Sequence, residues 1–447
     1  MDILIQILQL ILSLSILVVL HELGHFIPAK LFKTRVDKFY LFFDPWFSVV
    51  KKKIGDTEYG IGWLPLGGYV KIAGMVDESM DLEELNAEPK PWEFRSKPAW
   101  QRLIIMLGGV TVNLILAAFI YAMLLWAHGE RSIPMANAKY GFVADELATN
   151  IGIKTGDKIL GYDHKHTFDE ASAAVVKDLL LDNATSLQIE RNGEKMDIAI
   201  PEKVYQDLIQ AEGKKGFVHL AFPSDIDSVY PESPIAKAAK GGDKIIAIND
   251  TPINFFAEIG VVLRKNIGKD VSITLLRGAD TIVTNAKIPE TGKLSVSSRD
   301  LDKYFTVNEI HYNLLSAFPA GIHSAWVQLR DYVKQVRMMF NPRLKAYKQV
   351  GGFARITSLF PTTWNWTAFW MLTAFLSIML AFLNVLPIPA LDGGHALFTI
   401  YEMITGRKPS DKFLEYAQIV GMVFLFSLMI YANGNDFVRW ASAHFIH

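Results

Sequence analysis

The chain has 447 residues, of which 51% are hydrophobic, and its mean hydropathy is positive at +0.21. A formal net charge of −1 gives no indication of nucleic-acid binding, and the absence of cysteine excludes disulfides and thiolate chemistry. This composition is typical of a membrane protein and unusual for a soluble protein of this size.

Residues 1–27 begin with an apolar run at 3–20 that is long enough to cross a hydrocarbon core of about 30 Å. A cleaved signal peptide is the alternative. Met1 and Asp2 provide no basic start, however, and no small-x-small cleavage site follows. We therefore expect a retained first transmembrane helix.

The end of this run reads His21-Glu22-Leu23-Gly24-His25. On a helix, the two histidines lie one turn apart on one face and can bind a single Zn²⁺, with Glu22 placed to take a proton from water. Two histidines that merely cap a membrane helix at its interface are the alternative. Ionisable groups at membrane depth usually mark function, so the pattern predicts a metal site.

Residues 28–101 form a connecting segment, which contains GIGWLPLGGYVKI at 60–72. A second apolar run at 103–126 lies within the predicted helix 102–127. Lys and Arg are concentrated in 28–101 and in a later segment, 393–412. By the positive-inside rule, both segments are expected in the cytoplasm, and both chain termini are expected outside.

The next part of the chain has ordinary soluble composition and contains an internal repeat. Two pairs of segments match: 151–163 with 238–250, and 186–193 with 272–279. The Gly-Asp-Lys-Ile stretch shared by the first pair (156–159 and 242–245) and the whole of the second pair are offset by 86 residues. A repeat of this length predicts two copies of one small domain, at 128–205 and 206–292, because solenoids need more and shorter units.

Residues 293–362 form the predicted linker to the third span. Apolar residues between 318 and 340 recur at steps of three and four, which is typical of an amphipathic helix. Such a helix either lies on the outer membrane surface or packs under the repeats.

The third predicted span, 363–392, ends in NVLPIPALDGGH at 384–395, and a fourth span follows at 413–434 before the tail 435–447. A catalytic zinc usually has three protein ligands. Asp392 is the best third ligand, because the first and third spans run in the same direction and therefore end at the same face. Read without the first motif, Asp392 would be a helix cap, and His395 is a rival ligand.

Together these stretches resemble the site-2 protease family of intramembrane zinc metalloproteases, most closely its bacterial RseP (regulator of sigma E protease) branch. The family motif N-x-x-P-x-P-x-L-D-G is present without departure from Asn384 to Gly393. Residues 60–72 resemble the family's membrane-associated β-loop, and Gly67-Gly68 is expected to be the turn of the stretch 59–72. Asn-Asp-Phe at 435–437 resembles the end of the RseP fourth span. Two positions depart from the usual pattern: Val110 and Phe353 stand where relatives usually have proline.

The resemblance implies a polytopic α-helical membrane protein with four transmembrane helices, a membrane-associated β-hairpin or loop at 59–72, and two tandem PDZ-like α/β domains on the outer side. It implies a metalloendopeptidase that binds one Zn²⁺ per chain through His21, His25 and Asp392, with Glu22 as catalytic base. Contacts to substrate or to the transition state are implied for five further residues: Gly67, Gly68, Tyr69, Asn113 and Asn384.

The implied partners are the lipid bilayer and single-span membrane proteins, such as a pre-trimmed anti-sigma factor or remnant signal peptides, with no nucleic acid. The implied location is the inner membrane of a bacterium, with the PDZ-like domains and termini in the periplasm and the active site toward the cytoplasm. Two other interpretations are a membrane-anchored PDZ adaptor without chemistry and a zinc transporter. A transporter should have further acidic or His residues inside its spans, and spans two and three contain none.

Overall fold

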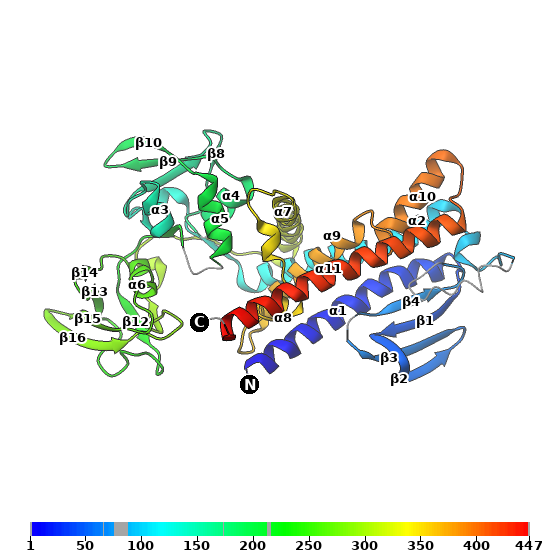
Figure 1. Cartoon of the computed structure of the whole chain (residues 1–447), viewed down its shortest axis with the longest axis horizontal. Coiled ribbons are helices and arrows are strands. Elements are labelled where there is room, and N and C mark those ends of the chain that lie inside the picture. The colour runs from blue at the N-terminus through cyan, green and yellow to red at the C-terminus, as the bar shows by residue number, and fades with distance from the viewer. Residues whose placement is uncertain (1, 66, 76–87, 173, 212–215, 446–447) are drawn as a thin grey trace. The chain divides into compact units, whose positions relative to one another are not determined.

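The computed structural model describes residues 2–65, 67–75, 88–172, 174–211 and 216–445 (Figure 1). It divides into two compact units. The first unit comprises Met1–Gly129, His311–Val333 and Val350–His447, and the second comprises Glu130–Ile310 and Lys334–Gln349.

The described part of the first unit contains four helices that are long and apolar enough to cross a membrane. They are α1 (Asp2–Leu31), α2 (Ala99–His128), α9 (Trp366–Val385) and α11 (Asp411–Phe445), and each overlaps one predicted span. The third helix ends earlier than predicted, at Val385, so Asp392 lies outside it. Figure 1 shows these helices running alongside one another in a bundle. Together with the β-sheets described below, they make the chain a polytopic membrane protein with β-rich domains.

Helices α1 and α9 run in the same direction, as polar contacts along their length show. Near the start of α1, Gln6 Nε2 donates to the carbonyl of Phe360, just ahead of α9, at 2.7 Å. In the middle of both helices, the hydroxyls of Ser13 and Thr373 are 2.9 Å apart. Near the far end, His21 Nε2 lies 3.2 Å from Asn384 Nδ2. The C-terminal ends of both helices therefore emerge on the same side of the bundle.

A four-stranded sheet follows α1 and has the order β2-β3-β1-β4. Its strands are β1 (Val36–Leu41), β2 (Phe43–Ile54), β3 (Thr57–Leu64) and β4 (Tyr69–Ile72). The sequence-based expectation of a hairpin across 59–72 is wrong, because β3 and β4 pair with opposite edges of β1 and not with each other. The hairpin in this sheet is β2–β3.

Strand β4 ends the sheet and lies against α1. The reason is visible at Gly68, which the sequence suggested as part of a turn. A Cβ on Gly68 would lie 2.6 Å from both the carbonyl oxygen of Tyr40 and Cγ1 of Val18, so only glycine allows the chain to approach this closely.

Three further helices complete the first unit: α7 (Leu314–Met339, of which the part to Val333 belongs here), α8 (Phe353–Thr357) and α10 (Asp392–Thr405). The predicted amphipathic helix thus exists as α7. A Cβ on its Gly321 would meet the backbone of Ala118 and Ala122, so α7 packs directly on α2.

The C-terminal half of α11 holds the segment that leads into α9. Asp436 Oδ2 accepts hydrogen bonds from the backbone amides of Gly352 at 2.9 Å and Arg355 at 3.1 Å. Asn433 Oδ1 accepts from the amide of Phe353 at 3.2 Å. The Asn-Asp-Phe stretch and the position of Phe353, both singled out in the sequence, therefore lie at one contact.

The second unit contains the two copies of the repeat, framed by the paired strands β5 (Glu130–Ser132) and β18 (Asn308–Ile310). The first copy consists of β6 (Phe142–Ala144), α3 (Glu146–Asn150), β7 (Lys158–Tyr162), β8 (His166–Thr167), α4 (Ala174–Asp182), β9 (Ser186–Arg191), β10 (Glu194–Ala199), α5 (Glu202–Gln210) and β11 (Val218–Leu220). The second consists of β12 (Ile226–Val229), β13 (Lys244–Ile248), β14 (Thr251–Pro252), α6 (Phe256–Arg264), β15 (Asp270–Arg277), β16 (Asp280–Lys287) and β17 (Val296–Ser298).

The two copies share one topology. Their four-stranded sheets have the orders β10-β9-β7-β8 and β16-β15-β13-β14. A buried ion pair recurs as well: Arg191 binds Asp157 and Arg277 binds Asp243, each with Nε to Oδ1 at 2.7 Å. Equivalent residues of the two ion pairs are 86 residues apart, which is the offset found in the sequence.

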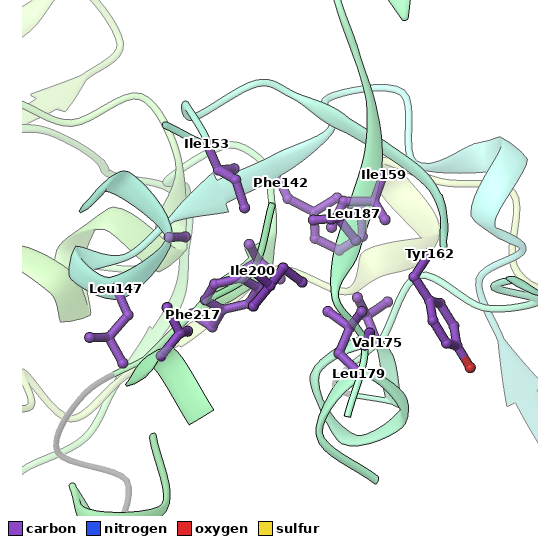
Figure 2. Close-up of a cluster of buried hydrophobic side chains, with 14 of the residues drawn as sticks. Phe142, Leu147, Ile153, Ile159, Tyr162, Val175, Leu179, Leu187, Ile200 and Phe217 are labelled. Atoms are coloured by element: carbon purple, nitrogen blue, oxygen red, sulfur yellow. The ribbon is translucent and has the colours of Figure 1, made fainter. Parts of the chain in front are cut away.

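Each copy has a hydrophobic core of its own. Figure 2 shows the core of the first copy, where side chains from its small strands, its sheet and α4 converge: Phe142, Leu147, Ile153, Ile159, Tyr162, Val175, Leu179, Leu187, Ile200 and Phe217. The second copy buries an isoleucine- and leucine-rich set around Ile245, Ile273 and Leu275.

Candidate metal centre

Three potential ligand atoms meet where α1, α9 and α10 come together. The Nε2 atoms of His21 and His25 are 3.3 Å apart, and each lies 3.3 Å from Oδ2 of Asp392. Among the described residues, these are the only three His, Asp or Glu side chains grouped closely enough to share an ion. The predicted triad is therefore brought together across more than 360 residues of sequence.

The spacing of these atoms fits zinc. Two ligand atoms that are each about 2.0 Å from an ion lie about 3.3 Å apart at the tetrahedral angle, which is the observed separation. Asp392 Oδ2 is buried and has no hydrogen-bond partner in the described part of the chain. Two imidazoles and one carboxylate form a donor set that zinc prefers, and they leave a fourth position for water or substrate.

Hydrogen-bonding groups of helix α2 orient both histidine rings. His25 Nδ1 lies 2.8 Å from the carbonyl oxygen of Ile105, so an Nδ1 proton leaves Nε2 free as a ligand. His21 Nδ1 lies 3.0 Å from the amide nitrogen of Asn113, and the Oδ1 atom of Asn113 is buried with no hydrogen-bond partner among the described residues. A half-turn of that amide would place Oδ1 against the Nδ1 proton of His21 and satisfy both groups.

Glycines on α1 and α2 allow the helices to approach at this level. A Cβ on Gly24 would lie 2.5 Å from the carbonyl oxygen of Gly108, so backbone meets backbone there. A Cβ on Gly109 would lie 2.5 Å from Cε1 of His21 and closer still to Nε2 of His25. Gly109 and Asn113 are one helical turn apart on α2, and both face the histidines.

Asp392 reaches the histidines because α9 stops and α10 starts in a new direction. Helix α9 ends at Val385, and the backbone between the helices includes Ala390 at a φ of 87°. Gly394 allows the first turn of α10 to contact the carbonyl oxygen of Ile388, where a Cβ would lie 2.5 Å away. The N-cap of α10 is Leu391, with no side-chain cap, so the Asp392 carboxylate faces the imidazoles and does not cap the helix.

A cavity of about 920 Å³ opens beside the three ligand atoms. Its lining includes most of the other residues singled out in the sequence: Glu22, Gly67, Gly68, Tyr69 and Asn384. Asn113 is not part of the lining and lies behind His21. His395, the rival ligand, lines the cavity but does not belong to the close triad.

The cavity lining includes the side-chain amide of Asn384 and the carboxylate of Asp44, each next to another polar group. Asn384 Nδ2 is 3.2 Å from His21 Nε2. The Tyr69 hydroxyl donates to Oδ1 of Asp44 at 2.8 Å. Burial, together with this hydrogen bond, holds the pKa of Tyr69 above its ordinary value, so Tyr69 remains protonated.

Among the polar residues of this lining, the sequence analysis gave no role to Asp44 or Gln418. Asp44 follows an aromatic strand and carried no motif. Gln418 had a usable signal, because it is a single amide near the start of the apolar run of the fourth span. Such a polar residue at membrane depth usually has a functional contact.

Comparisons with known proteins agree with this chemistry. The sequence profile of peptidase family M50 matches residues 9–428. The chain is 26% identical to the regulator of sigma-E protease RseP of Escherichia coli (strain K12), over 96% of this chain and 97% of that protein. It is also 26% identical to a Campylobacter jejuni protein named "Putative zinc metalloprotease Cj1068", over 97% of this chain and 94% of that protein. The chain therefore belongs to peptidase family M50, the site-2 protease family, and is a zinc-dependent metalloprotease of the membrane.

Proposed function

We propose that this enzyme hydrolyses peptide bonds within the transmembrane segments of single-span membrane proteins. The substrate class comprises an anti-sigma factor already trimmed outside the membrane and remnant signal peptides. The observation that carries the proposal is the position of the triad. His21 and His25 lie in the C-terminal part of a membrane-length helix, Asp392 follows the end of another, and all three line a cavity that reaches the end strand of a sheet.

The chemistry divides among the residues that line this cavity. A bound zinc ion supplies the Lewis acidity that activates water and polarises a carbonyl group. Glu22, one residue after the first ligand, takes the proton from the attacking water and delivers it to the leaving nitrogen. Asn384 donates a hydrogen bond from its amide to the oxyanion, a role supported by its place 3.2 Å from His21 Nε2. Asn113 acts through His21, which it keeps in the ligand orientation.

A helical substrate hides its amide bonds, so it has to unwind before it is cut. Backbone groups freed at membrane depth need new partners, because water is scarce there. Strand β4 ends its sheet and lines the cavity through Tyr69–Ile72, and the glycines at 67 and 68 bring this chain close to α1. Pairing with β4 would replace the helical hydrogen bonds of the substrate by strand addition.

We further propose that the enzyme lies in the inner membrane of a bacterium. By the distribution of Lys and Arg, both termini and the second unit face the periplasm, and the metal centre faces the cytoplasmic side. The two copies in the second unit are PDZ-like domains that screen substrates before they enter the membrane part. The shared topology of the copies, with a helix and a short strand pair beside each sheet, supports this assignment.

The test is reconstitution with a single-span substrate and mass spectrometry of the products, comparing wild type with Glu22→Gln. Wild type is expected to cut within the span, while Glu22→Gln retains zinc and yields no product. The matched control is Glu415→Gln at the start of α11, which should cut normally. Undiminished cleavage by Glu22→Gln would exclude Glu22 as the base, and cleavage only outside the span would exclude the proposed substrate class.

A further inference from the structure

Helix α11 has one buried amide side chain that the proposed mechanism does not use. Gln418 is 4% exposed, although α11 as a whole exposes most of its apolar side chains. It lines the same cavity as Glu22 and Asn384. Among the described residues, none forms a hydrogen bond with the Gln418 side chain. An amide held at membrane depth is costly unless something pairs with it, so its partner is expected in the cavity.

The backbone fixes Gln418 in this position. Gly421, nearly one helical turn further along α11, touches the carbonyl oxygen of Pro389 so closely that no Cβ fits between them. This contact presses α11 against the segment between α9 and α10, whose Ala390 and Leu391 also line the cavity. The side chain of Gln418 therefore belongs to a built wall of the site and is not a loose polar group on a lipid-facing helix.

An unwound substrate needs such a group. In an extended strand, backbone amides and carbonyls point alternately to the two edges, so pairing with β4 satisfies only one edge. The groups on the other edge would remain unpaired in a site with little water. A glutamine side chain offers two donor hydrogens and an acceptor oxygen, which matches both kinds of backbone group.

We propose that Gln418 is a substrate-binding residue that pairs with the substrate backbone on the edge that faces away from β4. This inference rests on the proposed function, because it concerns the strand that is cut at the metal centre. Asn384 is a different case, since its amide lies against His21 and serves the reacting carbonyl. Gln418 instead holds the main chain of the substrate beside the scissile bond, whatever side chains the substrate carries there.

Cross-linking can test the contact directly, because the chain contains no cysteine. A single Gln418→Cys change in the Glu22→Gln background is combined with single-span substrates that carry one cysteine each, scanned along the span. Disulfides are expected only within about two residues of the scissile bond, which spans the reach of one strand segment. The matched control is Val420→Cys on the same helix, which is 67% exposed and should give no such peak.

Kinetics give the second measurement. Replacing Gln418 by leucine should lower kcat/KM about tenfold, the effect of one lost hydrogen bond, while zinc content remains that of wild type. Val420→Leu should leave both values unchanged. A wild-type enzyme that does not cut the substrate would refute the proposed function and this inference with it. Normal cutting by wild type and by Gln418→Leu, with no disulfide at residue 418, would refute the role of Gln418 alone.

Discussion

The contact between Gly109 and the two histidines leads to a specific prediction for Gly109→Ala. An added Cβ would lie 2.5 Å from Cε1 of His21, whereas ordinary contact begins at 3.4 Å, so that ring or its helix must retreat by about 0.9 Å. Metal sites tolerate errors of only about 0.2 Å in ligand distance. The change should therefore lower zinc affinity by about 100-fold, the upper end of the effect of changing a group that contacts a metal ligand.

Zinc content of the purified protein, measured across a chelator series, is the appropriate assay. Alanine is a better helix former than glycine by about 1 kcal/mol, so a loss of zinc would not reflect weaker helix formation in α2. The matched control is Gly434→Ala on α11, where a Cβ meets nothing within 4 Å and zinc content should not change. Wild-type zinc affinity in Gly109→Ala would refute the reasoning, because it would mean that the rings are not confined by α2.

Three other changes test separate parts of the structure. Asp392→Asn should lower zinc affinity at least about tenfold, since the site loses its one anionic ligand. Arg277→Met leaves the buried Asp243 without its ion-pair partner and should destabilise the second copy by about 2 kcal/mol, a value reduced because Arg277 is 36% exposed. The hydrogen bond from Arg277 holds the pKa of Asp243 below its ordinary value, so this stabilisation is complete above about pH 4 and is lost as pH falls through the lowered pKa. Asp436→Ala removes two hydrogen bonds, including that from Gly352, and should speed amide exchange at residues 350–357.

Each of these three predictions has a result that would contradict it. Full zinc occupancy in Asp392→Asn would argue for another third ligand, with His395 as the nearest candidate. For Arg277→Met, the protection of the second copy from pepsin is measured. The control is Lys287→Met, which removes an exposed cation on the neighbouring strand. Equal protection in the two variants above pH 4 would exclude the ion pair as a stabiliser. Unchanged exchange at 350–357 in Asp436→Ala would show that α11 does not hold this segment.

The metal triad could be predicted from sequence because its determinants are local or topological. The helix fixes the spacing of His21 and His25. The first and third spans run in the same direction, so Asp392 reaches the same face of the membrane as the two histidines. The repeat was equally legible, since the Asp157–Arg191 and Asp243–Arg277 pairs preserve the 86-residue offset.

The sheet was predicted less well, because strand pairing depends on contacts that are distant in sequence. Gly67 and Gly68 were read as a hairpin turn, yet Gly68 is required for close approach to Val18 on α1. The contact of Gly24 with Gly108 was likewise invisible, since a glycine gives no sign of which backbone it will touch. Gln418 belonged to no motif; its place in an apolar run marked it as unusual, but the position of α11 was needed to show that it faces the cavity.

The position of β4 at the end of its sheet has a consequence for selectivity. A strand edge offers only amide and carbonyl groups, which are the same in every polypeptide. Recognition there would be indifferent to most side chains, and the discriminating property of a target becomes the ease with which its helix frays. Segments rich in glycine, proline or β-branched residues would then be cut sooner than uniform leucine spans, whatever protein they belong to.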